Sequence, residues 1–330
     1  MILVTGATGH IGNVLVRKLI EQGEKVRALI WRGEETTPLE KLDVETVEGD
    51  VLDPESLKPA FKGVEKVFHL AGIISIMPGQ NPLVWRVNVE GTRNVLNAAR
   101  QAGVRRLVYT SSIHAIHRAQ HGKVIDESLP FDPNNPYGAY DRSKAEASLE
   151  VQKATADGLD AVILCPTGVI GPYDFRGSEL GEVIRGAAEA RPMFYVEGAY
   201  DFVDVRDVAD GLIAAAEHGR RGESYILGGN KISVRYMLET VREVTGKAFA
   251  SIKIPFSLAE FAARFTPWYY QKTKAKPRFT PYSLEVLQSN ADISHAKAAR
   301  ELGYKPRPII ETIADTVRWF FENRRIKSAA

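Results

Sequence analysis

Residues 2–12 read ILVTGATGHIG and decide the fold. The apolar run ILVT (2–5) is typical of a buried strand, and residues 10–23 have the pattern of a helix that ends at Gly23. Between them, glycines stand at positions 6, 9 and 12. Such a turn lets the backbone approach a pyrophosphate, whose charge the N-terminus of the helix stabilises. The stretch therefore predicts a dinucleotide-binding turn, and the alternative is an ordinary tight turn.

The same alternation of short apolar strands and helical patterns continues through the first half of the chain. The expected strands are 25–31, 44–50, 65–72, 105–112 and 160–166, and the expected helices are 54–61, 84–103 and 139–157. Apolar strands that alternate with helices indicate a parallel sheet covered on both faces. The expected fold class is therefore α/β, with a doubly wound parallel sheet of the Rossmann type.

The regular alternation weakens after Pro172. Helical or strand patterns are still recognisable at 178–190, 200–219, 222–229, 232–246, 255–270 and 306–325. We expect residues 1–171 to form an NADP-binding Rossmann domain to which 200–230 return. Residues 172–199 and 231–330 are then expected to form most of a smaller C-terminal substrate-binding domain.

Composition limits the classes of partner. The chain has 330 residues, 44% of them hydrophobic and 25% charged, with a net charge of +2. This balance gives no reason to expect nucleic acid or a membrane as a partner. One cysteine, Cys165, cannot form an internal disulfide, and no signal peptide or membrane-spanning run is evident. A cytoplasmic protein is expected.

The end of the second expected strand bears on the choice between NAD and NADP. An acid at this position would bind the ribose 2'-hydroxyl, whereas an arginine would pair with a 2'-phosphate. The sequence reads ALIWRG and places Arg32 there without an acid. NADP is therefore the expected cofactor and NAD the alternative. Arg32 would otherwise be a solvated residue, with Trp31 covering the adenine side.

A tyrosine and a lysine one helical turn apart suggest acid–base chemistry. Tyr140 precedes Lys144 by four residues, while Tyr137 has Asp141 at that offset. A neighbouring positive charge lowers the pKa of a phenol, and a negative charge raises it. Tyr140 is therefore the candidate proton donor, and a helix-surface pair is the alternative.

Two serines end the expected strand 105–112, in the sequence YTSS. The carboxyl edge of a parallel sheet is where ligands bind in open α/β folds, and a hydroxyl there can stabilise charge on a substrate oxygen. Ser112, Tyr140 and Lys144 resemble the Ser, Tyr, Lys set of the short-chain dehydrogenases/reductases. That family places its catalytic serine second in such a pair, which favours Ser112 over Ser111.

Other segments extend the resemblance over almost the whole chain. The spacing G-x-x-G-x-x-G resembles the fingerprint of the extended short-chain dehydrogenases/reductases, and GDVLDPESL, VFHLAG, NVEGTRNVL, CPTGVIGP and FVDVRDVADG resemble further family segments. The resemblance implies a set of residues that line the cofactor site. They are Gly6, Thr8, Gly9, His10, Ile11, Gly12, Arg32, Asp50, Val51, Leu70, Ala71, Gly72, Asn88, Thr110, Ser111, Tyr140, Lys144, Pro166, Thr167 and Val169.

Departures from family patterns narrow the expected reaction. Dehydratases of the family carry the sequence TDE after the fifth strand, whereas this chain has no carboxylate there. Epimerases carry an arginine and an asparagine around the sixth strand, where this chain has Cys165 and Thr167. The chain looks most like the dihydroflavonol 4-reductase and 3β-hydroxysteroid dehydrogenase branch. That branch implies NADP-dependent reduction of a ketone or aldehyde on a hydrophobic substrate. The alternatives are a nucleotide-sugar epimerase with tightly bound NAD and a non-catalytic redox sensor.

Two further groups of residues need an interpretation. An aromatic, apolar stretch consists of Phe256, Leu258, Phe261, Phe265, Trp268, Tyr269 and Tyr270, followed by the basic residues Lys272, Lys274, Lys276 and Arg278. It suits a cover for a flat hydrophobic substrate, with helix packing or a membrane-surface role as alternatives. The histidines 114, 117 and 121 are expected to lie in a polar loop without a metal. A homodimer is possible through the two long helices that flank the fifth and sixth strands.

Overall fold

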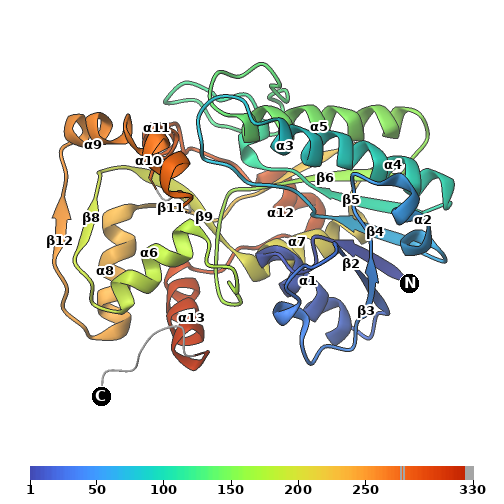
Figure 1. Cartoon of the computed structure of the whole chain (residues 1–330), viewed down its shortest axis with the longest axis horizontal. Helices are drawn as coiled ribbons and strands as arrows, with labels where there is room; N and C mark the ends of the chain where they lie inside the picture. Colours follow the sequence, from blue (N-terminus) through green and yellow to red (C-terminus); the bar gives the residue numbers. More distant parts are fainter. Residues whose placement is uncertain (276, 278, 324–330) are drawn as a thin grey trace.

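A seven-stranded parallel sheet forms the centre of the protein, in a computed structural model that describes residues 1–275, 277 and 279–323 (Figure 1). The strand order is β10-β6-β5-β4-β1-β2-β3. The strands are β1 (Ile2–Thr5), β2 (Val26–Ile30), β3 (Glu45–Glu48), β4 (Lys66–His69), β5 (Arg106–Thr110), β6 (Ala161–Pro166) and β10 (Ser224–Leu227). The prediction of a Rossmann-type doubly wound parallel sheet is confirmed.

Apart from the exposed edge strand β3, the sheet is buried on both faces because its strands are largely apolar at successive positions. In β1, Leu3 points into one hydrophobic core while Ile2 and Val4 point into the other. In β5, Leu107 belongs to the first core and Val108 to the second. Since side chains alternate along a strand, a continuous apolar run fills both cores at once.

Helices cover the two faces (Figure 1). On one face, α1 (His10–Glu21) packs against α7 (Val205–His218), and α12 (Ala296–Leu302) packs against α7 and β10. On the other face lie α2 (Pro54–Phe61), α4 (Gly91–Gln101) and α5 (Ala139–Ala156). The helix expected at 84–103 is divided into α3 (Pro82–Trp85), a π-helical turn (Arg86–Glu90) and α4.

The later part of the chain forms two small sheets with their own helices. The first has the order β11-β9-β7, and the second pairs β12 with β8. Their bounds are β7 (Gly168–Ile170), β8 (Met193–Tyr195), β9 (Ala199–Asp204), β11 (Asn230–Ser233) and β12 (Ser251–Lys253). The helices are α6 (Glu179–Ala188), α8 (Val234–Thr245), α9 (Phe256–Ala263), α10 (Thr266–Thr273), α11 (Pro281–Gln288) and α13 (Ile309–Glu322). The division of the chain into two domains stays a prediction.

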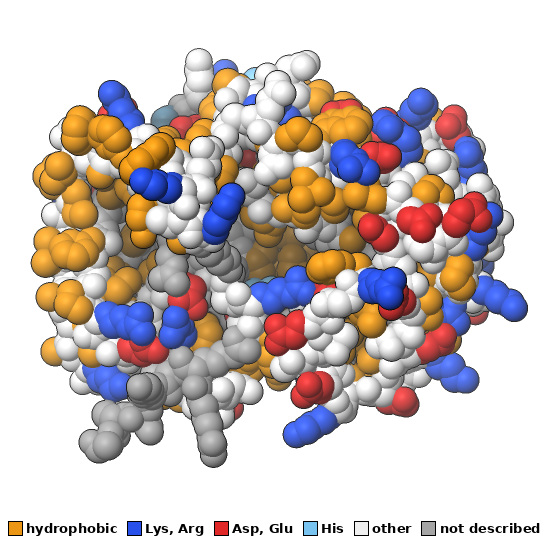
Figure 2. All heavy atoms as spheres, in the orientation of Figure 1, with side chains coloured by type: hydrophobic (Ala, Val, Ile, Leu, Met, Phe, Trp, Pro, Cys, Tyr) orange, Lys and Arg blue, Asp and Glu red, His pale blue; other side chains and the backbone are white. Residues whose placement is uncertain are grey.

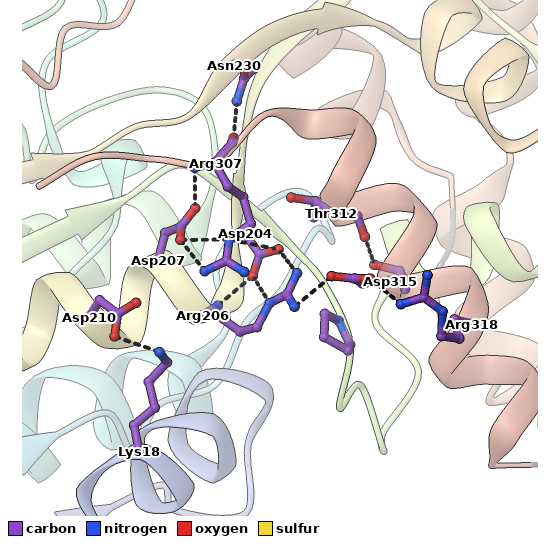
Figure 3. Close-up of polar contacts among 12 residues, drawn as sticks. Lys18, Asp204, Arg206, Asp207, Asp210, Asn230, Arg307, Thr312, Asp315 and Arg318 are labelled. Carbon is purple, nitrogen blue, oxygen red and sulfur yellow. Dashed lines mark hydrogen bonds and ion pairs between the residues drawn. The ribbon is translucent and has the colours of Figure 1, made fainter. Parts of the chain in front are cut away.

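A cluster of charged residues fastens α13 and the segment before it to β9 and α7 (Figure 3). Arg206 bridges Asp204 at 2.7 Å and Asp315 of α13 at 2.8 Å. Arg307 pairs with Asp207 at 2.7 Å. Burial lowers the pKa of Arg206, but its hydrogen bonds and ion pairs with Asp204 and Asp315 outweigh this effect and raise the pKa. Among the described residues, no helix is both long enough and apolar enough to cross a membrane.

Candidate active site

The residues singled out from the sequence gather at the carboxyl ends of β1, β4, β5 and β6. This edge of the sheet faces a hollow between the parts of the molecule that carry α1 and α6, with hydrophobic side chains inside it (Figure 2). Ligands of open α/β sheets bind outside the carboxyl ends of the strands. The hollow is therefore the candidate active site.

The glycine turn has no room for side chains. A Cβ on Gly6, whose φ is +69°, would lie 2.7 Å from the backbone nitrogen of Ala71, and a Cβ on Gly12 would lie 2.1 Å from the carbonyl oxygen of Gly6. The turn is thus packed closely against the end of β4 and against the first turn of α1. Gly9 is the N-cap residue of α1 and has no side chain, so the amide groups that begin the helix are free of a capping side chain. This is the cradle that a pyrophosphate requires.

The other predicted residues of the turn contact a distant segment. His10 Nε2 lies 2.9 Å from the carbonyl oxygen of Pro172, and Ile11 packs at the edge of the core. Arg176 donates to the hydroxyl of Thr8 at 2.6 Å and to Glu34 at 2.7 Å. Residues 172–176 therefore lie directly against the cofactor turn.

Glu34 was missed by sequence reasoning. It follows the end of β2 by four residues, yet its carboxylate accepts a hydrogen bond of 2.5 Å from Thr8 and one of 3.1 Å from the amide of Trp31. Arg32 is exposed beside it. An acid and an arginine thus both follow the end of β2, where the choice between NAD and NADP is expected to be made. The short loop after β2 folds back, which no periodic pattern could indicate.

Asp50 and Val51, which are predicted to contact adenine, follow the end of β3. Asp50 accepts a hydrogen bond from the amide of Leu52 at 2.8 Å and is exposed. Val51 is buried, and its carbonyl accepts a hydrogen bond of 2.9 Å from Asn94. Because β3 runs parallel to β2 and β1, both residues lie at the same sheet edge as the glycine turn.

His69 joins three parts of the site and was also missed. The hydroxyl of Thr5 accepts a hydrogen bond from the amide of Ala71 and lies 2.7 Å from His69 Nδ1. The hydroxyl of Thr92 donates to the carbonyl of Asn88 and lies 3.0 Å from His69 Nε2. The hydroxyl of Thr5 therefore donates to Nδ1, and Nε2–H donates to Thr92. Burial, and then the charge of Lys144, lower the pKa of His69 to about 3.

The turn after β4 lies beside the candidate lysine. Asn88 holds this turn through Ile73, accepting from its amide at 2.8 Å and donating to its carbonyl at 3.0 Å. A Cβ on Gly72 would lie 3.0 Å from Asn88 Oδ1 and 3.5 Å from Lys144 Nζ. Leu70 is partly buried against the second core. The close approach shows why glycine stands at position 72.

The two serines after β5 have different partners. The side chain of Ser112 lies close enough to Tyr140 to lower the pKa of its phenol, and it accepts a hydrogen bond from the amide of His114 at 3.2 Å. The hydroxyl of Ser111 lies 2.7 Å from that of Ser148 on α5. The structure therefore brings Ser112, rather than Ser111, to the candidate proton donor.

The pKa of Tyr140 is raised, whereas the sequence predicted a lowered pKa. Burial raises its pKa to about 12, and the nearby side chain of Ser112 opposes this rise. Lys144 Nζ instead donates to the carbonyl of Thr110 at 2.8 Å and lies 5.0 Å from the ring centre of Tyr109. Burial lowers the pKa of Lys144 to about 8. The expectation that Lys144 lowers the pKa of Tyr140 gave too little weight to the burial of both groups.

Tyr137, which is half-buried, and the buried Asp141 both contact Arg118. The guanidinium of Arg118 lies 3.7 Å from the ring centre of Tyr137 and donates to Asp141 at 3.0 Å. Tyr282 of α11 donates to Asp141 at 2.7 Å. Asp141 therefore ties α5 to a distant part of the chain and does not pair with Tyr137.

The three histidines of the loop after β5 point to different partners. His114 stacks on Tyr200 at 5.9 Å and lies 6.4 Å from the ring of Tyr140. His117 lies 2.9 Å from Asp132, and His121 lies 3.0 Å from the carbonyl of Gln288. No group of three potential metal ligands occurs within the described residues. His114 is the histidine that borders the site.

The segment after β6 leads from the main sheet to β7 of the small sheet. Pro166 ends β6, and Val169 pairs with Val203 in the small sheet. The hydroxyl of Thr167 donates to the buried Asp201 at 2.6 Å. Thr167 is thus held by a carboxylate rather than turned toward the solvent.

Comparisons with known proteins agree with this arrangement. The family model described as the NAD dependent epimerase/dehydratase family matches residues 2–228. The chain is 38% identical to sterol demethylase protein B of Methylococcus capsulatus, over 98% of this chain and 99% of that protein. A protein of Synechocystis sp. with dihydroflavonol 4-reductase in its name is 34% identical, over 98% and 96%.

Solved structures show the same fold. The crystal structure of gox2253 has a TM-score of 0.86 at 34% identity, covering 99% of both chains. The UDP-glucose 4-epimerase of Thermus thermophilus, in complex with NAD, has a TM-score of 0.77 at 25% identity and covers 97% of this chain and 98% of that one. The family model covers more than half of the chain, and its relatives span the full length. The chain therefore belongs to the NAD dependent epimerase/dehydratase family, the extended short-chain dehydrogenases/reductases.

Proposed function

We propose that the protein is an NADP-dependent oxidoreductase that reduces a ketone or aldehyde on a hydrophobic substrate. The observation that carries the proposal is the proximity of Ser112 to Tyr140 at the carboxyl edge of the sheet, with Lys144 one helical turn away on α5. A proton donor, a second hydroxyl and a cation at this edge suit the reduction of a carbonyl group.

Tyr140, Ser112 and Lys144 have different roles in the proposed reduction. When bound, the reduced nicotinamide supplies the hydride for the carbonyl carbon. The phenol of Tyr140 donates its proton to the carbonyl oxygen as that oxygen gains negative charge. Its pKa of about 12 keeps this proton in place at neutral pH. Ser112 holds the same oxygen by a hydrogen bond, and Lys144 supplies positive charge beside Gly72 and the carbonyl of Thr110.

The residues present fit a dinucleotide. Gly6 and Gly12 allow the close packing of the turn, which leaves the first amide groups of α1 without a capping side chain. The buried hydroxyl of Thr110 has no hydrogen-bond partner among the described residues. Arg32 supports NADP, because a guanidinium pairs well with a 2'-phosphate. The carboxylate of Glu34, held by Thr8, favours NAD as the second candidate.

The hydrophobic character of the substrate rests on two observations. Rings of His114, Tyr200 and Tyr282 lie close together next to Tyr140, so the substrate side of the site is aromatic. Cys165 and Thr167 provide neither an arginine nor an amide for a sugar diphosphate. A nucleotide-sugar epimerase with retained NAD is the second candidate reaction. The cytoplasmic location and the homodimer remain predictions.

The test compares the oxidation of NADPH and of NADH with a panel of steroid, flavonoid and small aldehyde substrates. The proposal expects substrate-dependent loss of NADPH absorbance. A companion assay offers nucleotide sugars, where an epimerase would turn over substrate without net consumption of the cofactor. Turnover of a nucleotide sugar with none of the carbonyl compounds reduced would replace the proposal with the epimerase reaction.

A further inference from the structure

Two consecutive helices expose large apolar side chains in a regular stripe. Arg264 and Phe265, which join α9 to α10, keep right-handed helical backbone angles, so the helical path is nearly continuous. Leu258, Phe261, Phe265 and Trp268 follow one another at spacings of three, four and three residues. Such spacing places side chains on one face of a helix. These four residues are named the apolar stripe.

The stripe faces solvent rather than the protein. Its side chains are exposed by 58%, 60%, 58% and 63% in sequence order, whereas Ala259 and Ala263 on the neighbouring face are buried against Val196 and Leu284. A surface helix normally buries its large apolar residues and exposes its polar ones. Here the small residues pack inward and the large ones remain outside.

Other apolar residues enlarge the patch. Phe194 of β8 and Ile252 of β12 are exposed on the paired strands that precede α9, and Tyr269 is exposed next to Trp268. Figure 2 shows hydrophobic side chains gathered along the margin of the molecule that carries β8, β12 and α9. A contiguous exposed patch of this kind marks an interaction surface.

Positive charge lies at the end of the stripe. Lys272 stands 5.2 Å from the ring centre of Trp268, and Lys274 follows it. Neither lysine pairs with a carboxylate among the described residues, while Glu260 is matched by Arg264 at 3.5 Å. The surface is thus apolar, aromatic and cationic at once.

We propose that the apolar stripe docks on the surface of a lipid bilayer that contains anionic lipids. Tryptophan and tyrosine favour the headgroup level of a bilayer, where their rings are partly buried and their polar ends stay wet. Lysines beside them are attracted to anionic headgroups. Lysine is depleted in protein–protein interfaces, so a partner protein or a second copy of this chain fits the surface less well. The proposal departs from the expectation that the protein has no membrane partner.

The stripe is connected to the active site through α11. Thr280, just before this helix, donates to the carbonyl of Ile76 at 2.8 Å, and Tyr282 donates to Asp141 beside Tyr140. A bilayer docked on the stripe would hold hydrophobic molecules close to the elements that border the site. This link to the substrate rests on the proposed reductase function, whereas the docking itself does not.

The experiment floats the full-length protein with vesicles of phosphatidylcholine and with vesicles of phosphatidylcholine and phosphatidylglycerol. Binding to the mixed vesicles is expected, and it should weaken as salt is added. The double variant Phe265→Ser/Trp268→Ser should lower the binding constant by about tenfold or more for each side chain removed. The variant Lys272→Gln/Lys274→Gln should lower binding to the mixed vesicles by about fivefold for each charge and change binding to the neutral ones little.

Ile310→Ser, which removes an exposed apolar residue of α13, is the matched control and should bind as the wild type does. NADPH oxidation with a water-soluble aldehyde, measured on the same variants, separates failure of docking from failure of the proposed reaction. Absence of the wild type from the vesicle fraction would overturn the proposal, as would undiminished binding by the stripe variant. Self-association that the stripe variant abolishes, without vesicle binding, would identify the stripe as an interface between two copies.

Discussion

Tyr282, in helix α11, donates a hydrogen bond of 2.7 Å to Asp141, the residue that follows the candidate proton donor Tyr140. Asp141 is completely buried, and Arg118 donates to its second oxygen at 3.0 Å. A buried carboxylate is stable only when its charge and its lone pairs are matched. The position of the catalytic helix therefore depends on a residue that lies 141 positions further along the chain.

Tyr282→Phe removes this hydrogen bond and keeps the ring. The free energy of unfolding should fall by about 1.5–3 kcal/mol, because a hydrogen bond to a buried charged group is lost. Denaturant unfolding followed by circular dichroism measures the change. Tyr236→Phe, at an exposed position, is the control and should unfold as the wild type does. Equal stability of all three proteins would show that the bond does not hold α11 in place.

Ser112→Ala should lower kcat by about tenfold to a hundredfold, because it removes one donor to the developing oxyanion. Ser111→Ala takes away the contact with Ser148 and should lower stability by about 1 kcal/mol with a smaller change in kcat. Steady-state reduction and thermal unfolding are measured on both variants. A larger loss of kcat in Ser111→Ala would reverse the assignment of the two serines.

Stability should decline as the pH falls from 6.5 toward 3, in part through His69. Burial lowers the pKa of His69 from 6.5 to about 3 in the folded protein. Between these values the unfolded chain binds a proton that the folded chain does not, so the stabilisation is complete above pH 6.5 and is lost as the pH falls. Unfolding at a series of pH values measures the slope. His69→Gln should flatten it, and parallel slopes for the two proteins would contradict the proposed state of His69.

Arg32→Ala should weaken the binding of NADPH by about tenfold or more and leave NADH nearly unchanged, because only NADPH carries the 2'-phosphate. Glu34→Gln should act in the opposite direction and favour NADPH, since it removes a negative charge held beside Thr8. Fluorescence titration with the two nucleotides gives both dissociation constants. Equal weakening of NADPH and NADH by Arg32→Ala would remove the basis for NADP.

Periodicity was sufficient to predict the main sheet, because its strands are buried on both faces and its helices are amphipathic. The short strands β7, β8, β11 and β12 were missed, since three or four residues carry no period. Within the site, the strand ends and the glycine turn could be placed from the sequence. Glu34 and His69 could not, because a loop that folds back and a histidine inside an apolar strand leave no pattern in the chain.

The pKa values of the site residues could not be predicted from the sequence either. The four-residue spacing predicted that the charge of Lys144 would lower the pKa of the Tyr140 phenol. In the structure both side chains are buried, and burial is the main cause of both pKa shifts. The aromatic stretch from Phe256 onward shows the converse. Its composition suggested a cover for a flat hydrophobic substrate, and the solvent exposure of its large side chains became evident only from the structure.

The central claim is that Tyr140 donates the proton in carbonyl reduction, and Tyr140→Phe tests it most directly. The variant keeps the ring and loses the hydroxyl, so we predict that NADPH-dependent reduction falls by about a hundredfold to ten-thousandfold while NADPH binding is preserved. Tyr137→Phe keeps the ring that stacks on Arg118 and should retain the wild-type rate. Reduction by Tyr140→Phe at a rate near that of the wild type would contradict the account.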